Sequence, residues 1–186
     1  MFGDEALVLV HDDEGGVAYH PGCVPAATAA CWFDVLLPLM PWRSQRRPMY
    51  DRIVDVPRLT ASVMLGDPRR PHCIGAALAA VRTVAPAPYT HVGLNLYRDG
   101  RDSVALHGDH VPQLVAGWPI AILSLGAPRE LLIRARAGGV SGRVTLEPGS
   151  VLVMSHASQR THEHGVPKCR EAAGPRISLA FRVRRI

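Results

Sequence analysis

The sequence predicts a mainly β protein with an α/β N-terminal lobe, and its β core is expected to be a barrel or a double-sheet jelly roll. Seven short runs rich in valine, leucine and isoleucine follow Tyr89 at close spacing, with Gly, Pro and Asp between them. Before Tyr89, two alanine-rich segments carry apolar residues at helical spacing. The 186 residues, 47% of them hydrophobic, suffice for one domain with a buried core.

The N-terminal segment, residues 1–88, is expected to begin with a strand at Leu7–Val10, which ends in turn residues. Helices are predicted over 25–37 and 74–84, with Pro25 in the first turn of the first helix. Pro38 and Pro41 are expected to end the first helix, because proline removes a hydrogen bond from a helix interior. Between the helices, Trp42–Tyr50 is basic and aromatic without a period. It predicts either a loop or hairpin, or a contact to nucleic acid, since cations meet phosphates and flat rings stack on bases.

The core, residues 89–186, is expected to consist of strands with little helix. We predict its seven strands at Val92–Tyr97, Ser103–His107, Ile120–Leu125, Glu130–Ala135, Arg143–Leu146, Val151–Ser155 and Ile177–Arg182.

Charge and composition indicate which partners and compartments to expect. The net charge of +5 favours polyanionic partners, although charge alone is weak support. The acidic N-terminus is a poor secretory signal, and no apolar run approaches the roughly 18–20 residues that span a bilayer. Four cysteines without C-x-x-C spacing predict thiols in a reducing compartment. We therefore expect a cytoplasmic protein without a membrane partner.

A candidate metal site begins at His107-Gly108-Asp109, at the end of a predicted strand. In an extended chain, residues two apart point to the same face, so the imidazole and the carboxylate can converge on one ion. With His164 as a third ligand they would form a facial triad, which holds iron(II) and leaves three positions open. The pattern H-x-D is also common by chance, and zinc could occupy such a triad.

The C-terminal strand carries Arg176 and Arg182, six residues apart and therefore on one face. Burying two guanidinium groups without anions is costly, and a small dicarboxylate would meet that need. The alternative is a solvated strand, which we expect for Arg184 and Arg185. By the same logic, Asn95 and Tyr97 can donate hydrogen bonds to one carboxylate.

Taken in order, these motifs resemble the AlkB family of nucleic-acid dealkylating dioxygenases over roughly residues 89–182. In addition, Pro57-Arg58-Leu59-Thr60 resembles the Pro-Arg segment that follows the substrate lid of that family. The matching segments are Asn95-Leu96-Tyr97-Arg98-Asp99-Gly100, His107-Gly108-Asp109, Ile122-Leu123-Ser124-Leu125-Gly126, Pro148-Gly149-Ser150-Val151-Leu152-Val153-Met154, His164-Gly165-Val166-Pro167-Lys168 and Arg176 to Arg182.

The resemblance implies a jelly-roll core, also called a double-stranded β-helix, with Fe(II), 2-oxoglutarate and O2 as cofactor and co-substrates. Iron would be held by His107, Asp109 and His164, with His162 as a competitor for the last position. Arg176 would bind the distal carboxylate of 2-oxoglutarate, and Arg182 would lie nearer the metal. Ser178 stands where some members carry asparagine. The implied 2-oxoglutarate residues are Asn95, Tyr97, Arg176, Ser178 and Arg182.

The implied activity is oxidative dealkylation of damaged bases, which releases succinate, CO2 and an aldehyde. The partner would be nucleic acid, DNA rather than RNA, bound by a monomer, and the base would leave the stack to reach the metal. The implied lid around residues 42–60 would contact substrate through Trp42, Arg43, Arg46, Arg47 and Tyr50.

The pocket departs from the family pattern at two positions. Val111, after His110, stands where many members carry an acid that contacts the lesion base, and Met154 replaces a stacking aromatic residue. We therefore expect a less polar pocket, which would prefer bulky lesions such as etheno adducts to methylated adenine and cytosine.

Two other functions are compatible with the sequence. The first is a 2-oxoglutarate-dependent hydroxylase of a small molecule or protein. The second is a non-catalytic jelly-roll binding module, against which the paired arginines weigh.

Overall fold

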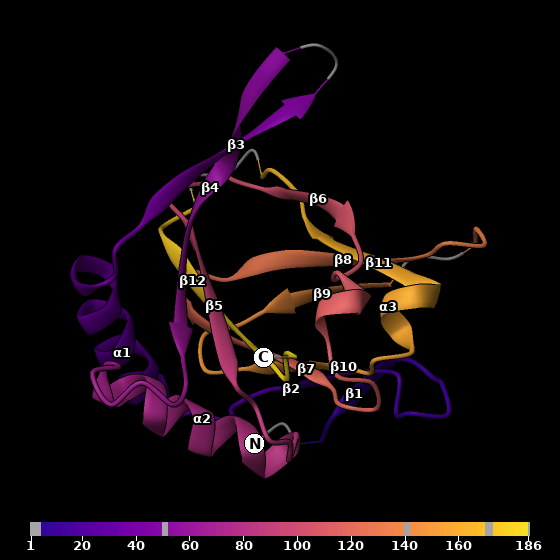
Figure 1. The fold of residues 1–186 in the computed structure, drawn as a ribbon, viewed down its shortest axis with the longest axis horizontal. Helices are drawn as coiled ribbons and strands as arrows, with labels where there is room; N and C mark the ends of the chain where they lie inside the picture. Colours follow the sequence, from indigo (N-terminus) through magenta and orange to yellow (C-terminus); the bar gives the residue numbers. More distant parts are fainter. Residues whose placement is uncertain (1–4, 50–51, 140–141, 170–172, 186) are drawn as a thin grey trace.

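The computed structural model describes residues 5–49, 52–139, 142–169 and 173–185, with side chains for all of these except 45–49 and 52–55. Two antiparallel sheets face each other, which confirms the predicted mainly β jelly-roll class (Figure 1). The larger sheet has the order β1 (Leu7–Val10), β2 (Val17–His20), β10 (Val151–Met154), β7 (Ile120–Gly126), β12 (Arg176–Arg182), β5 (His91–Tyr97), β4 (Arg52–Met64), β3 (Arg43–Met49). The smaller sheet has the order β6 (Val104–His107), β11 (His162–Val166), β8 (Arg129–Ala135), β9 (Gly142–Leu146).

Two helices, α1 (Ala26–Leu39) and α2 (His72–Val84), cover the outer face of the larger sheet (Figure 1). Their buried side chains, among them Leu36 and Ile74, join one hydrophobic core with the sheet. Pro38 was expected to end the first helix, but it lies inside its last turn. The helix ends one residue later, at Leu39, with the Met40 amide still bonded to the Leu36 carbonyl.

Strand β12 separates this core from the space between the sheets. Ile177, Leu179 and Phe181 are fully buried in the core beneath the helices. Ala180 belongs instead to the second core, between the two sheets, and Arg176 and Arg182 share its face. The predicted alternation of β12 is therefore confirmed.

Strands β3 and β4 form a hairpin that extends the larger sheet beyond the smaller one (Figure 1). The predicted basic segment is thus the edge strand of a hairpin, whose partner pairs with β5 on its other side. Residues 1–88 contribute strands to both edges of the larger sheet, and the division of the chain at residue 88 stays a prediction.

Three strands lie where no strand was predicted: β2, β4 and β11. Two short helical turns complete the chain, η1 (Val111–Gln113) and α3 (Ser158–Thr161). Within the described residues, none of the helices has the length and apolar character needed to cross a membrane.

Candidate active site

A cavity with a volume of roughly 1460 Å³ opens between the sheets. One side of its lining comes from the hairpin strands β3 and β4, and the floor comes from β5 and β12. Strands β6, β8 and β11 of the smaller sheet line the opposite side. All eight residues predicted to hold the metal or 2-oxoglutarate line it together: Asn95, Tyr97, His107, Asp109, His164, Arg176, Ser178 and Arg182.

The three predicted metal ligands come together at one end of the cavity. His107 on β6 and His164 on β11 are direct partners across the ladder, with ring centroids 4.5 Å apart. Asp109 follows β6 by two residues, and one ligand atom from each residue lies within 4.8 Å of the others. Two imidazoles and one carboxylate are a donor set that suits iron(II). His162, the competitor, lies outside this group.

A hydrogen bond to His107 and the burial of His164 suit both imidazoles to metal binding. The Nδ1 atom of His107 lies 2.9 Å from the carbonyl oxygen of Ala105. Because a carbonyl only accepts, Nδ1 donates this hydrogen bond, and Nε2 is the ring nitrogen that remains for a metal ion. Burial and the nearby His107 lower the pKa of His164 to about 4, so its imidazole is neutral at pH 7.

Gly108 occupies a position between the ligands where a side chain does not fit. A Cβ atom there would lie 2.6 Å from the carbonyl oxygen of Gln159 and 2.7 Å from Nη2 of Arg136. The next amide, of Asp109, donates a 3.0 Å hydrogen bond to Oε1 of the buried Gln159. Gln159 therefore holds the turn that presents the carboxylate, and no sequence signal pointed to it.

The Asp109 carboxylate is paired with Arg182, which reaches it from the opposite sheet. Nε of Arg182 donates to Oδ2 of Asp109 at 2.5 Å. Burial would raise the pKa of Asp109, but the charge and hydrogen bond of Arg182 outweigh it and hold the pKa below its usual value. The carboxylate is therefore ionised at neutral pH.

Arg176 lies at the other end of β12 and is fully buried. Its Nη2 donates to Oγ of Ser124 at 2.9 Å, while Nε and Nη1 have no hydrogen-bond partner in the described part of the chain. Burial lowers the pKa of this guanidinium, and the neighbouring Tyr97 opposes that effect. Buried donors without partners are uncommon, so the cavity wall here fits an anionic group.

Asn95 and Ser178 meet on the cavity floor beside the arginines. Nδ2 of Asn95 donates to Oγ of Ser178 at 3.2 Å, and Oδ1 accepts from Nε of Arg58 at 2.9 Å. Arg58 on β4 therefore joins the site. Its Pro-Arg motif was noted in the sequence, but its side-chain contact with Asn95, whose partner in the ladder is Thr60, could not be read there.

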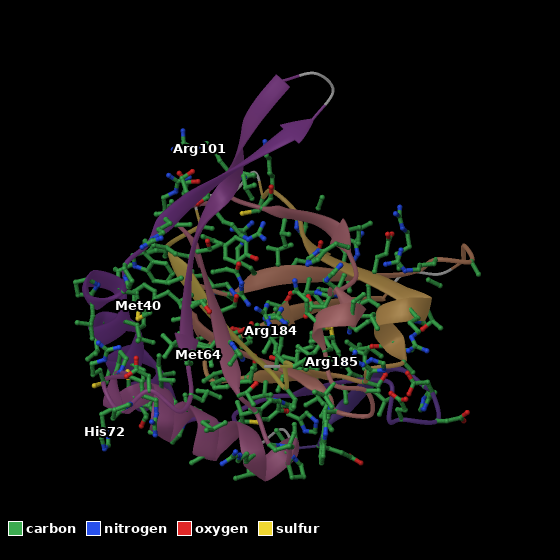
Figure 2. All side chains as sticks on the ribbon, in the orientation of Figure 1. Met40, Met64, His72, Arg101, Arg184 and Arg185 are labelled. Atoms are coloured by element: carbon green, nitrogen blue, oxygen red, sulfur yellow. The ribbon has the colours of Figure 1, made fainter. Side chains whose placement is uncertain are left out.

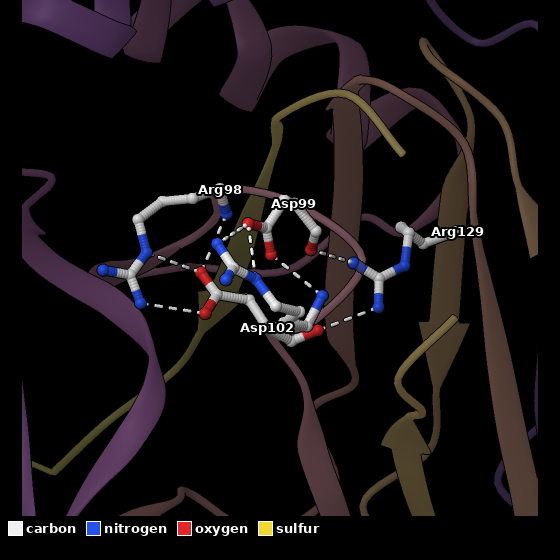
Figure 3. A network of polar contacts seen from close by, with 5 residues as sticks. Arg98, Asp99, Asp102 and Arg129 are labelled. Carbon is white, nitrogen blue, oxygen red and sulfur yellow. Dashed lines mark hydrogen bonds and ion pairs between the residues drawn. The ribbon is translucent and has the colours of Figure 1, made fainter. Parts of the chain in front are cut away.

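Two guanidinium groups lie close to the ring of Tyr97. The Cζ atoms of Arg176 and Arg129 are 5.2 and 5.6 Å from its ring centroid. Arg129 is itself buried and donates to the carbonyl oxygens of Asp99 and Asp102 (Figure 3). It also donates to the carbonyl oxygen of Pro167. The turn between β5 and β6 is thereby tied to β8 and to the segment just after His164.

The predicted substrate residues divide into those that reach the cavity and those that do not. Arg43 and His110 line it. Trp42 does not; its Nε1 donates to the carbonyl of Leu37 at 2.8 Å and its ring packs on the core, so it anchors the end of α1. Tyr50 lies outside the described residues, as do the side chains of Arg46 and Arg47, whose backbones belong to β3.

Val111 and Met154 do not line the cavity either. Val111 starts η1, and Met154 is fully buried in the core between the sheets. The expected apolar pocket wall is therefore not formed by these two residues. Arg184, expected to be solvated, is instead partly buried and lines the cavity, which corrects that expectation.

Two facing sheets of a double-stranded β-helix, with a two-histidine, one-carboxylate group at one end of the cavity between them, define a metal-dependent oxygenase class. The model of the 2OG-Fe(II) oxygenase superfamily matches residues 68–182, and the chain belongs to this superfamily. Fe(II), 2-oxoglutarate and O2 are the cofactor and co-substrates of that superfamily.

Curated relatives confirm the resemblance to AlkB proteins. DNA oxidative demethylase ALKBH2 of Homo sapiens is 34% identical in an alignment of 110 residues that covers 55% of this chain and 42% of that protein. Alpha-ketoglutarate-dependent dioxygenase alkB homolog 3 of Mus musculus is 28% identical in an alignment of 187 residues, gaps included, that covers 89% of this chain and 65% of that protein. The chain thus spans less than two thirds of the length of either relative.

Solved structures share the fold. OsALKBH1 superposes with a TM-score of 0.62 at 19% identity, covering 90% of this chain and 97% of that one. A 2OG-Fe(II) oxygenase family oxidoreductase from Burkholderia pseudomallei gives a TM-score of 0.58 at 20% identity, covering 90% and 84%.

Proposed function

We propose that this chain is an Fe(II)- and 2-oxoglutarate-dependent oxygenase that removes alkyl groups from damaged nucleic-acid bases. One observation carries the oxygenase assignment: the triad and the unsatisfied, buried Arg176 line the same cavity. The nucleic-acid assignment rests on the relatives, and DNA rather than RNA is favoured by the name of the first of them.

His107, Asp109 and His164 are the proposed iron ligands. Arg182 keeps Asp109 ionised and oriented, since it holds one carboxylate oxygen. When bound, iron and 2-oxoglutarate supply with O2 the oxidant that hydroxylates the alkyl carbon, and the products are succinate, CO2 and an aldehyde.

Arg176 is the proposed partner of the distal carboxylate of 2-oxoglutarate. Its two unpartnered nitrogens, Nε and Nη1, lie on different sides of the guanidinium group, so each can donate a separate hydrogen bond to an anionic ligand, and Ser124 and Tyr97 fix the guanidinium plane. Asn95 lies between Arg176 and the triad along the floor and offers further polar atoms. The distal carboxylate would thus be bound at one end and the metal-chelating end held near Asp109.

The β3–β4 hairpin is the proposed nucleic-acid contact. Arg43 lines the cavity next to Arg58 and Thr60, and the strand beyond it carries two further arginines. Cations at the mouth of a cavity can hold the phosphates on either side of a base that has left the stack.

The test is release of succinate and of the repaired base from oligonucleotides that carry single alkylated bases, with iron(II) and 2-oxoglutarate supplied. We expect turnover that depends on the lesion and is absent for the unmodified oligonucleotide and for the variant Asp109→Ala. Succinate release from 2-oxoglutarate that is stimulated by a small-molecule or protein substrate but by none of the lesions would contradict the nucleic-acid assignment and leave the oxygenase class intact.

A further inference from the structure

Arg184 places a third guanidinium group on the cavity face of the C-terminal segment. It continues the even-numbered register of Arg176 and Arg182 and lines the same cavity. Figure 2 labels Arg184 toward the middle of the molecule. A bridge pairs it with Leu114, directly after the η1 turn that follows the metal-binding motif. Burial lowers the pKa of its guanidinium, the charge of Arg182 lowers it further, and the charge of Asp109 acts in the opposite direction.

The side chain of Arg184 has donor capacity that the described protein groups do not use. Its Nε is buried and has no hydrogen-bond partner among the described residues. Its main chain, in contrast, is well held, because the amide donates to Oγ of Thr90 at 3.0 Å. The neighbouring Arg185 is exposed and its amide donates to the Gln113 carbonyl, so it does not share this environment.

The charges around Arg184 are unbalanced. Among the described residues that line the cavity, Asp109 is the one carboxylate, and Arg182 already engages it. Five arginines line the same space: Arg43, Arg58, Arg176, Arg182 and Arg184. The end of the cavity near Arg184 therefore offers donors and positive charge, with no carboxylate left to accept a hydrogen bond.

Alkylated bases differ in charge and in the hydrogen-bonding groups that they would present to the arginine-lined part of the cavity. Alkylation at N1 of adenine or N3 of cytosine leaves a cationic ring with an exocyclic amine, which is a donor. Alkylation at N1 of guanine or N3 of thymine replaces a ring N–H, so the ring stays neutral and presents carbonyl oxygens, which are acceptors. A guanidinium group pairs with carbonyl acceptors and repels a cationic ring.

We propose that Arg184 is a specificity-determining residue, which donates to the carbonyl oxygen of a neutral, keto-type lesion base and disfavours cationic, amino-type lesions. This inference rests on the proposed function and names its substrate class: 1-alkylguanine and 3-alkylthymine in preference to 1-alkyladenine and 3-alkylcytosine.

The experiment measures kcat/KM on four otherwise identical oligonucleotides, which carry 1-methylguanine, 3-methylthymine, 1-methyladenine or 3-methylcytosine. The wild-type protein is compared with Arg184→Met, Arg184→Lys and the matched control Arg185→Met, each checked for 2-oxoglutarate affinity. We expect the wild type to prefer the keto lesions by on the order of 10-fold. Arg184→Met should remove most of that preference, Arg184→Lys should retain part of it, and Arg185→Met should leave it unchanged.

Three results would overturn the inference. The first is a wild-type preference for the amino lesions. The second is an equal loss of kcat/KM on all four lesions in Arg184→Met, which would indicate that Arg184 contacts a phosphate group. Each of these leaves the proposed function standing, because lesions are still repaired. Absence of turnover on all four lesions would remove the proposed function together with the inference.

Discussion

The two ends of strand β12 carry the same residue type in opposite states. Arg182 is paired with Asp109, so its charge is neutralised within the protein. Arg176 is more deeply buried, and two of its nitrogens have no partner among the described residues. The guanidinium group of Arg182 therefore has its counter-charge within the protein and orients Asp109, the proposed metal ligand. The guanidinium group of Arg176 lacks a counter-charge, which a bound anion would supply. Four substitutions test this difference.

The largest effect is expected from Asp109→Ala, which removes the carboxylate that both Arg182 and the proposed metal use. Iron(II) affinity and succinate release should fall by more than about 100-fold, the upper end for losing an outer-shell partner. Metal binding measured by calorimetry, with Mn(II) in place of the oxidisable ion, checks this. Retention of tight metal binding would show that the ion is held elsewhere.

Arg182→Met should destabilise the protein, because it leaves the buried Asp109 carboxylate without its partner. Breaking a buried ion pair in this way costs about 3–5 kcal/mol of the free energy of unfolding. Urea denaturation of the metal-free protein measures the change. Arg185→Met serves as the control, since it removes an exposed arginine nearby, and an equal loss in the two variants would argue against the pair.

Arg176→Met should change ligand binding and leave the stability of the fold largely intact, which is the opposite of the effect expected for Arg182→Met. The metal-free protein should be as stable as the wild type or more so, because a buried and poorly satisfied charge is replaced by an apolar side chain of similar length. The KM for 2-oxoglutarate should rise about 30-fold or more, as expected when one partner of a buried charge pair is truncated. A destabilised variant with an unchanged KM would mean that Arg176 serves the fold and not the ligand.

The smallest effect is expected from Gly108→Ala, which leaves all charges in place. The new methyl group would meet the main-chain carbonyl of Gln159, so the turn that carries Asp109 must shift. We expect metal affinity to fall roughly 10-fold, within the range for a disturbed outer shell. Gly66→Ala is the matched control, because a Cβ at Gly66 meets nothing within 4 Å.

The sequence predicted the two ends of β12 unequally well. Parity along a strand placed Arg176 and Arg182 on one face, and the fold confirms it, because the alternating isoleucine, leucine and phenylalanine pack beneath the helices. Which arginine is paired could not be predicted, since that depends on Asp109 arriving from the other sheet.

The elements that were missed lacked a local signal. Strand β11 holds His164 but reads His162-Glu163-His164-Gly165, which is polar, and its pairing with β6 and β8 determines its structure. Gln159 supports Asp109 across 50 residues of chain, a contact that no spacing rule indicates. Strand β12 ends at Arg182. Continuing its alternation of faces by two more residues would have placed Arg184 on the same face as Arg176 and Arg182.

The most direct test of the difference between the two ends is an anaerobic titration of the iron(II)-loaded protein, followed by its weak visible absorption band. The ligands are 2-oxoglutarate and 2-oxopentanoate, which has the same carbon chain but no distal carboxylate. We predict that the wild type binds 2-oxoglutarate far more tightly, and that Arg176→Met binds the two ligands with similar, weak affinity. Equal affinity of the wild type for both ligands would contradict the assignment of Arg176 as the anion-binding end.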